Sequence, residues 1–201
     1  MLDVTRAVDV VLQACIALAE AHRAGIVHRD LKPANLFLTT RVDGEPCVKV
    51  LDFGISKVLD DEQEKLTSGH LGTPAYMPPE QLRAAAQVDS RADVWSLGVI
   101  LFELLTGRYA FHAESLAELF AAILSDPPIP LRSVRPDAPP EIEEAIARCL
   151  VKDRQQRMAD VGALAAAIAP FGGDDAPTAL QRIARTLGQR SQTDAWSARS
   201  R

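Results

Sequence analysis

The sequence has few cysteines and no long hydrophobic run, and each shortage excludes a class of protein. The three cysteines, Cys15, Cys47 and Cys149, are scattered without any Cys-x-x-Cys pair, so neither a zinc site nor a disulfide framework is indicated. The longest apolar run, 94–105, contains Glu103 and is too short to span a bilayer. The N-terminus also lacks the apolar core of a secretion signal. We therefore expect a cytoplasmic protein with no membrane segment in this chain.

Basic residues are also fewer than acidic residues. Lys and Arg number 22 against 27 Asp and Glu, which gives a formal net charge of −5 and a pI near 5.4. A dedicated nucleic-acid binder needs a basic surface to meet the phosphate backbone, so no nucleic-acid partner is expected. Hydrophobic residues make up 47% of the 201 positions, which is ordinary for a globular protein, and this length suits one domain with a real core.

Apolar residues recur at helical spacing in several segments. The first runs from Val4 through His22, with Asp3 placed to cap its start and Gly25 just past its end. The proline-rich stretch 126–140 is expected to be an extended loop. The other predicted helices cover 90–106, 114–124, 141–151 and 159–169.

Two short strands are predicted between the first two helices. They cover 36–38 and 48–51, and a polar turn joins them. Towards its end the chain becomes polar, and we expect 172–201 to be a poorly ordered tail with a weak helix over 178–187. The whole pattern is typical of a mainly α fold with a short β-hairpin.

The stretch His28–Asn35 gathers the side chains that can do chemistry. It is predicted to be a loop because Pro33 fixes φ and removes a backbone donor. The loop presents Asp30, Lys32 and Asn35 together. A carboxylate can accept a proton from an attacking hydroxyl, an ammonium can offset charge on a phosphoryl group in transfer, and an amide oxygen is a hard ligand suited to Mg²⁺. Taken alone, such a charged loop is more often simply solvated.

Three further motifs follow this loop in a fixed order. They are Asp52-Phe53-Gly54, the segment 72–80 (Gly-Thr-Pro-Ala-Tyr-Met-Pro-Pro-Glu) and the segment 93–98 (Asp-Val-Trp-Ser-Leu-Gly). With them, the chain resembles the C-terminal lobe of a protein kinase, and Lys32 followed by Pro33 is similar to the serine/threonine class of bacterial type. The resemblance implies a mainly α kinase-like lobe, a helical bundle with a short β-hairpin region that carries the catalytic and metal-binding loops. It covers a partial kinase domain over 1–171.

The resemblance implies a role for each polar group of the site. Asp30 would orient the substrate hydroxyl and accept its proton, and Lys32 would neutralise the γ-phosphate of ATP. Asn35 and Asp52 would hold Mg²⁺, so ATP and Mg²⁺ are the expected cofactors. The phosphate acceptor would be a Ser or Thr hydroxyl of a protein substrate.

By resemblance, two further features would contact ATP and the substrate peptide. Phe37 would lie under the adenine ring, although plain packing in a strand is compatible with the same position. Thr73 would hydrogen-bond Asp30 and Lys32, and 72–76 would form the shelf for the substrate peptide.

Other residues are implied to support the site. Glu80 would reach Arg157 in a buried ion pair, and Asp93 would hold the backbone of the catalytic loop. Phe53 would pack on His28, so that imidazole would be structural and not a general base.

A regulatory site is also implied. The polar stretch 59–70 is similar to the variable part of an activation loop. Arg29 could clamp a phosphorylated residue there, with Thr67 as the first choice and Ser68 as the second. The alternative, that these are two small polar loop residues without such a role, stays open.

Other kinase motifs do not occur in the sequence. It contains no Gly-x-Gly-x-x-Gly loop, no Val-Ala-Ile-Lys-type lysine and no partner-glutamate helix, which form the N-terminal lobe in the family. We expect the chain alone to hold one wall of the nucleotide site and to be weakly active or inactive. A missing N-terminal lobe or partner chain would complete it.

Three hypotheses follow for function. The chain is the catalytic half of a serine/threonine protein kinase, a non-catalytic kinase-lobe module for binding or regulation, or a helical structural partner whose catalytic residues are relics. Folding does not demand the set Asp30, Lys32, Asn35, Asp52 and Thr73, so their joint presence favours the first hypothesis over the third.

Overall fold

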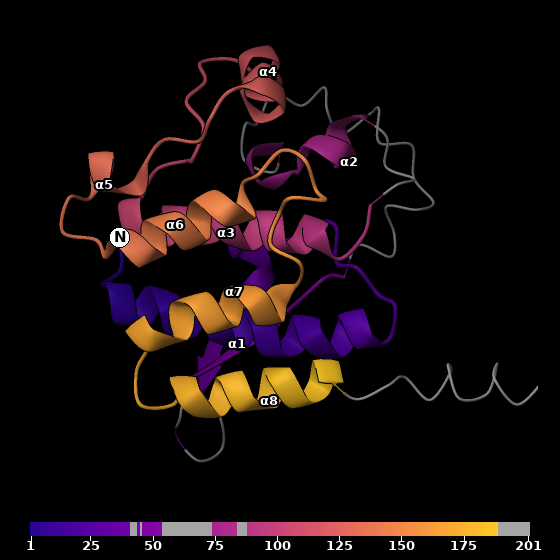
Figure 1. The fold of residues 1–201 in the computed structure, drawn as a ribbon, viewed down its shortest axis with the longest axis vertical. Coiled ribbons are helices and arrows are strands. Elements are labelled where there is room, and N and C mark those ends of the chain that lie inside the picture. Colours follow the sequence, from indigo (N-terminus) through magenta and orange to yellow (C-terminus); the bar gives the residue numbers. More distant parts are fainter. Residues whose placement is uncertain (41–43, 45, 54–73, 84–87, 189–201) are drawn as a thin grey trace, which may run out of the picture.

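The computed structural model describes residues 1–40, 44, 46–53, 74–83 and 88–188, and Figure 1 shows their arrangement. The α-helices are α1 (Val4–Arg23), α2 (Pro79–Arg83), α3 (Arg91–Thr106), α4 (Leu116–Ser125), α5 (Leu131–Val134), α6 (Pro140–Cys149), α7 (Val161–Ile168) and α8 (Ala176–Gly188). The short 3₁₀ helices are η1 (Pro33–Asn35), η4 (Pro74–Tyr76) and η6 (Ala169–Phe171), and the strands are β1 (Leu36–Thr40) and β2 (Pro46–Val50). The predicted mainly α fold with a short hairpin is confirmed.

Helix α3 forms the centre of the core because it is apolar on almost every face. Its residues 92–102 are all buried, and α1, α6 and α7 pack against it (Figure 1). Gly98 lets α6 approach closely, since a Cβ at this position would lie 2.5 Å from the Cβ of Cys149. The helix ends at Gly107, whose φ of 69° lies in the left-handed region that favours glycine.

Helix α1 begins and ends where the sequence predicts. Asp3 accepts the N–H of Arg6 on its Oδ1 at 2.8 Å, which caps the first turn. After the last turn, Gly25 takes a φ of 75° and redirects the chain into the loop that follows. The predicted helices over 114–124, 141–151 and 159–169 are found as α4, α6 and α7, with their ends shifted by one or two residues.

The hairpin is antiparallel, and its register decides which residues meet at its open end. Leu36 pairs with Val50, and the N–H of Leu51 donates to the carbonyl of Asn35 at 2.9 Å. The N–H of Val48 donates to the side chain of Gln13 at 2.7 Å, which fixes the hairpin on α1. The residues that precede β1 and follow β2 therefore lie side by side.

The helix predicted over 178–187 is found as residues 176–188, whereas the expectation of poor order is wrong for this segment. They form α8, which packs along α1 as Figure 1 shows, with Ala176 and Ile183 buried. The side chain of Arg182 also pairs with Glu20 on α1 at 2.8 Å. The apolar residues of this segment recur at helical spacing, but only the folded chain supplies a surface for them to cover. Residues 189–201 lie outside the described part of the chain, and the domain boundary at 171 stays a prediction.

The proline-rich stretch 126–140 is mostly irregular, as expected, but it is not entirely so. Residues 131–134 form the one-turn helix α5, and Pro140 already belongs to α6, where it takes the first helical position. Among the helices that the structure describes, none is long and apolar enough to cross a membrane.

Candidate active site

The catalytic loop brings together the three polar residues that the sequence singles out. Lys32 Nζ lies 3.2 Å from Asp30 Oδ2 in the turn between α1 and η1. Asn35 Nδ2 donates to the backbone carbonyl of Asp30 at 2.8 Å, and Asn35 is buried. Because the amide nitrogen is engaged in this bond, Oδ1 is the Asn35 atom that can coordinate a cation.

Asp52 stands at the open end of the hairpin beside Asn35. It directly follows Leu51, which donates its N–H to the Asn35 carbonyl at 2.9 Å, and its own side chain is exposed. One carboxylate and one amide oxygen are a donor set that fits Mg²⁺, which keeps several waters and takes substrate phosphates as further ligands. No cluster of three or more His, Cys, Asp or Glu that could hold a metal is found within the described ranges.

Two residues of the site have strained backbones. Arg29 has a φ of 64° and Asp52 a φ of 53°, and they are the non-glycine residues with positive φ in the part of the chain that the structure describes. Such a conformation costs about 1–3 kcal/mol, so it persists only where the surroundings hold it. The strain therefore lies next to Asp30 and at Asp52, both of which the sequence predicts to be functional.

Asp93 is one group that holds the strained loop. It is completely buried at the start of α3, and it accepts the N–H of His28 on Oδ2 at 2.9 Å and the N–H of Arg29 on Oδ1 at 3.0 Å. These contacts confirm the predicted supporting role. A third donor was missed at the sequence level: His22 Nε2 lies 2.7 Å from Asp93 Oδ2. No pattern in the sequence distinguishes this histidine from any other in a last helical turn.

His28 links the catalytic loop to the hairpin. Its Nε2 lies 2.8 Å from the carbonyl of Leu51, which can only accept, so Nε2 carries the proton. Nδ1 is then the acceptor for the N–H of Asp30 at 3.3 Å. The Phe53 ring packs on the imidazole with centroids 4.9 Å apart. The prediction that Phe53 packs on His28 is confirmed, and with both nitrogens engaged the imidazole is structural.

One face of the hairpin exposes apolar side chains. Phe37 pairs with Lys49 across the strands, and Leu51 lies two residues further along on the same face. Phe37 is 55% exposed and Leu51 40% exposed. The alternative that Phe37 is plain strand core is therefore wrong for this structure. Contact of this face with an adenine ring stays a prediction.

Several predicted residues lie outside the described part of the chain. Thr73, Thr67 and Ser68 are among them, so their expected contacts stay predictions. Arg29, the expected phosphate clamp, is described. Its Nε is buried without a hydrogen-bond partner among the described residues, and a donor of this kind is suited to an anion.

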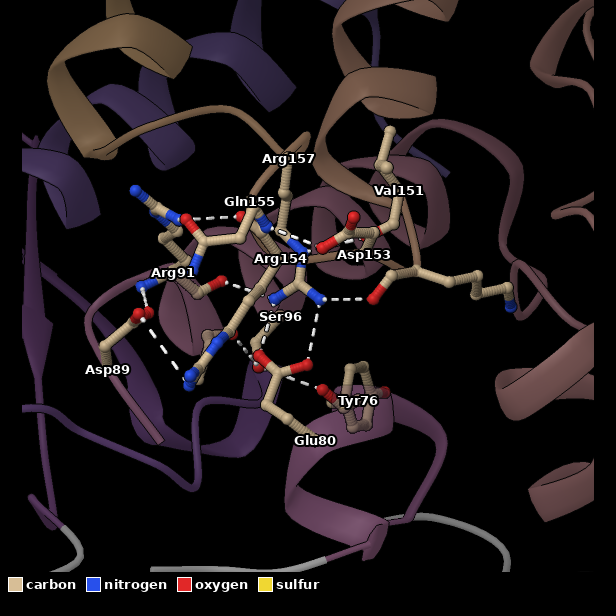
Figure 2. Close-up of polar contacts among 12 residues, drawn as sticks. Tyr76, Glu80, Asp89, Arg91, Ser96, Val151, Asp153, Arg154, Gln155 and Arg157 are labelled. Atoms are coloured by element: carbon tan, nitrogen blue, oxygen red, sulfur yellow. Dashed lines mark hydrogen bonds and ion pairs between the residues drawn. The ribbon is translucent and has the colours of Figure 1, made fainter. Parts of the chain in front are cut away.

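The segment after the predicted peptide shelf is anchored by a buried ion pair, shown in Figure 2. Arg157 donates from Nη1 to Glu80 Oε1 at 2.7 Å and from Nη2 to Glu80 Oε2 at 2.9 Å. Its other donors reach the carbonyls of Arg91 and Val151, both at 3.0 Å, and its guanidinium lies over the ring of Trp95. A bidentate pair with its remaining donors satisfied is the arrangement that a buried charge requires. The predicted Glu80–Arg157 pair is confirmed.

The preceding helix η4 is fixed to α3 in a similar way. Ser96 Oγ donates to the carbonyl of Tyr76 at 2.9 Å, and Tyr76 donates its hydroxyl to Glu103 at 2.6 Å. Burial and this hydrogen bond raise the pKa of Tyr76, so the phenol stays protonated and remains a donor. Tyr76 and Glu80 are thus both bonded to the core.

A helical lobe with these groups on a loop and a hairpin is of the type that transfers phosphoryl groups with a nucleotide and a metal ion. The family model described as the protein kinase domain matches residues 1–168. The chain therefore belongs to the protein kinase family, whose members use ATP and Mg²⁺ and act on proteins.

Curated relatives are bacterial serine/threonine kinases. The chain is 47% identical over 157 residues to the serine/threonine-protein kinase Pkn1 of Myxococcus xanthus, covering 78% of this chain and 22% of that protein. It is 42% identical over 167 residues to pkn3 of the same organism, covering 80% and 30%. It is 35% identical over 186 residues to PknB of Mycolicibacterium smegmatis, covering 90% and 29%. The match thus spans less than a third of the length of each of these relatives.

Proposed function

We propose that the chain is the catalytic lobe of a cytoplasmic serine/threonine protein kinase, which transfers the γ-phosphate of ATP to Ser or Thr hydroxyls of a protein substrate. The observation that carries this proposal is the grouping of Asp30, Lys32 and Asn35 on one loop whose strained backbone Asp93 holds.

In the proposed reaction the substrate hydroxyl oxygen attacks the γ-phosphorus while the bond to the β–γ bridging oxygen breaks, and ADP leaves. Asp30 orients the hydroxyl and accepts its proton, and Lys32, 3.2 Å from that carboxylate, offsets the negative charge of the transferring group. Asn35 and Asp52 would hold Mg²⁺, which would neutralise charge on the phosphates. By resemblance to the family, Thr73 would hydrogen-bond Asp30 and Lys32.

The exposed face of Phe37 and Leu51 is the proposed floor for the adenine ring. A floor alone leaves the ring open to water, so we infer that strong nucleotide binding needs a covering lobe on this face. By itself the chain would then transfer phosphate weakly or not at all, because phosphoryl transfer depends on positioning from both sides.

The experiment that tests this proposal adds the covering lobe. A kinase N-terminal lobe with its own lysine and glutamate is fused ahead of Asp3, and transfer from labelled ATP to Ser/Thr peptides is measured. Asp30→Asn should lower turnover by about 10²–10⁴, the usual contribution of general-base catalysis. The matched control is Asp174→Asn, the same change at an exposed position. If Asp30→Asn lowers turnover no more than this control while the fusion stays folded, the chain is a binding module and the proposal is wrong.

A further inference from the structure

The peptide group between Arg29 and Asp30 is held at both of its ends. The carbonyl of Arg29 accepts a hydrogen bond from Nε2 of Gln81 at 2.9 Å, and the N–H of Asp30 donates to Nδ1 of His28 at 3.3 Å. On the N-terminal side of Arg29, the Arg29 N–H donates to Oδ1 of Asp93 at 3.0 Å. The plane of this peptide sets the direction in which the Asp30 side chain leaves the backbone.

Gln81 comes from a distant part of the chain. It lies on α2, 52 positions after Arg29, and is only 8% exposed. Because a carbonyl can only accept, the amide nitrogen of Gln81 must face Arg29 and the amide oxygen must face away. That oxygen, Oε1, is buried with no hydrogen-bond partner among the described residues.

These contacts give Gln81 little net effect on the folding free energy. A net hydrogen bond contributes about 0.5–1.5 kcal/mol, whereas a buried polar atom without a partner costs about 1–3 kcal/mol. The two terms are of similar size, so the contacts of the amide with the described residues bring little net gain in folding free energy. The amide does fix the orientation of a strained peptide next to the proposed proton acceptor.

The support for Gln81 is rigid. Its neighbour Glu80 makes two hydrogen bonds to Arg157, at 2.7 and 2.9 Å, and the backbone N–H of Gln81 itself donates to the carbonyl of Pro78 at 3.0 Å. Helix α2 begins at Pro79, three positions after the segment 72–76 that is proposed as the peptide shelf. Gln81 therefore joins the substrate side of the lobe to the catalytic loop.

We propose that Gln81 is a positioning residue, which orients the Asp30 carboxylate through the Arg29 carbonyl. The kinetic meaning of this role rests on the proposed function, whereas the geometry can be tested without it. A displacement of about 1 Å in a reacting group can lower a rate about a hundredfold, so loss of the Gln81 donor should lower kcat by about tenfold to a hundredfold. The KM for ATP should not change, since Gln81 contacts no group assigned to the nucleotide.

The first measurement uses chain 1–201 and needs no activity. Amide hydrogen exchange is followed by NMR in the wild type, in Gln81→Met, which removes the donor, and in Gln81→Glu, which keeps the shape but presents an acceptor. Both variants should shift the Asp30 amide resonance and speed its exchange, with α3 amides unchanged. The control is Gln181→Met, the same change at an exposed position on α8. If Asp30 exchanges as in the wild type in a folded Gln81→Met or Gln81→Glu chain, the proposal is wrong.

The second measurement uses the fusion described above. A fall in kcat at constant KM for ATP in Gln81→Met supports the positioning role, whereas equal kcat in variant and wild type overturns it. Asp30→Asn is measured beside it to separate two kinds of failure. If Asp30→Asn is inactive and Gln81→Met is fully active, only the inference about Gln81 fails. If Asp30→Asn is fully active, the proposed function fails, and hydrogen exchange alone decides whether Gln81 orients Asp30. Should Gln81→Met not fold, Gln81→Glu decides both measurements.

Discussion

Replacing Asp93 with asparagine tests how far the catalytic loop depends on a single buried carboxylate. The two carboxylate oxygens accept from the N–H groups of His28 and Arg29 and from Nε2 of His22. Asparagine has almost the same shape, but it has one oxygen, and its NH₂ group would face a donor in place of the other. At least one of these hydrogen bonds must therefore be lost.

The size of the effect follows from these contacts. A hydrogen bond to a charged acceptor contributes about 1.5–3 kcal/mol, so Asp93→Asn should lower the free energy of unfolding by about that amount. Domains of this kind have about 5–15 kcal/mol of stability, so the variant should remain folded. Arg29, with its φ of 64°, would then be held less firmly, and the loop should lose order before the core does.

Urea denaturation followed by circular dichroism measures this difference. The control is Asp137→Asn, whose carboxylate is 75% exposed and lies 3.5 Å from Arg135. A surface pair of this kind contributes about 0–1 kcal/mol. A loss for Asp93→Asn no larger than that of the control would refute the reasoning. The double variant His22→Gln with Asp93→Asn should lose less than the sum of the single variants, because both changes act on the same hydrogen-bonded pair.

Two further predictions concern the buried Arg157 and the half-buried Lys152. Arg157→Met should lower stability by about 3–5 kcal/mol because it leaves Glu80 buried without its partner, and adding Glu80→Gln should restore part of the loss in thermal unfolding. Burial lowers the pKa of Lys152 from its ordinary 10.5 to about 8, although its ammonium reaches the carbonyls of Ala122 and Ile123. The unfolded chain then holds this proton to higher pH than the folded chain does, so the Lys152 contribution to stability should rise between pH 8 and 10.5. To isolate this contribution, the unfolding free energies of wild type and Lys152→Met are compared between pH 8 and 10.5. A difference that does not change with pH would contradict the prediction.

The sequence by itself determined the features that depend on near neighbours. The cap at Asp3, the apolar spacing of α1 and the all-round apolar character of α3 specify helices through local propensity and period. Pro33 fixes φ and removes a backbone donor, so no α-helix runs through the segment that carries Asp30, although Pro33 itself begins the short 3₁₀ helix η1. Order along the chain was enough for the kinase resemblance, and the family match agrees with it.

Only the tertiary structure decided which distant groups meet. Gln81 reaches Arg29 across 52 positions and His22 reaches Asp93 across 71, and neither pair leaves a pattern in the sequence. Helix α8 was underestimated for the same reason, since its apolar face gains free energy only when α1 is there to cover it. Helix period and chain stiffness are properties of adjacent residues, whereas a strained peptide such as that of Arg29 exists only because the packed core brings its hydrogen-bond partners to it.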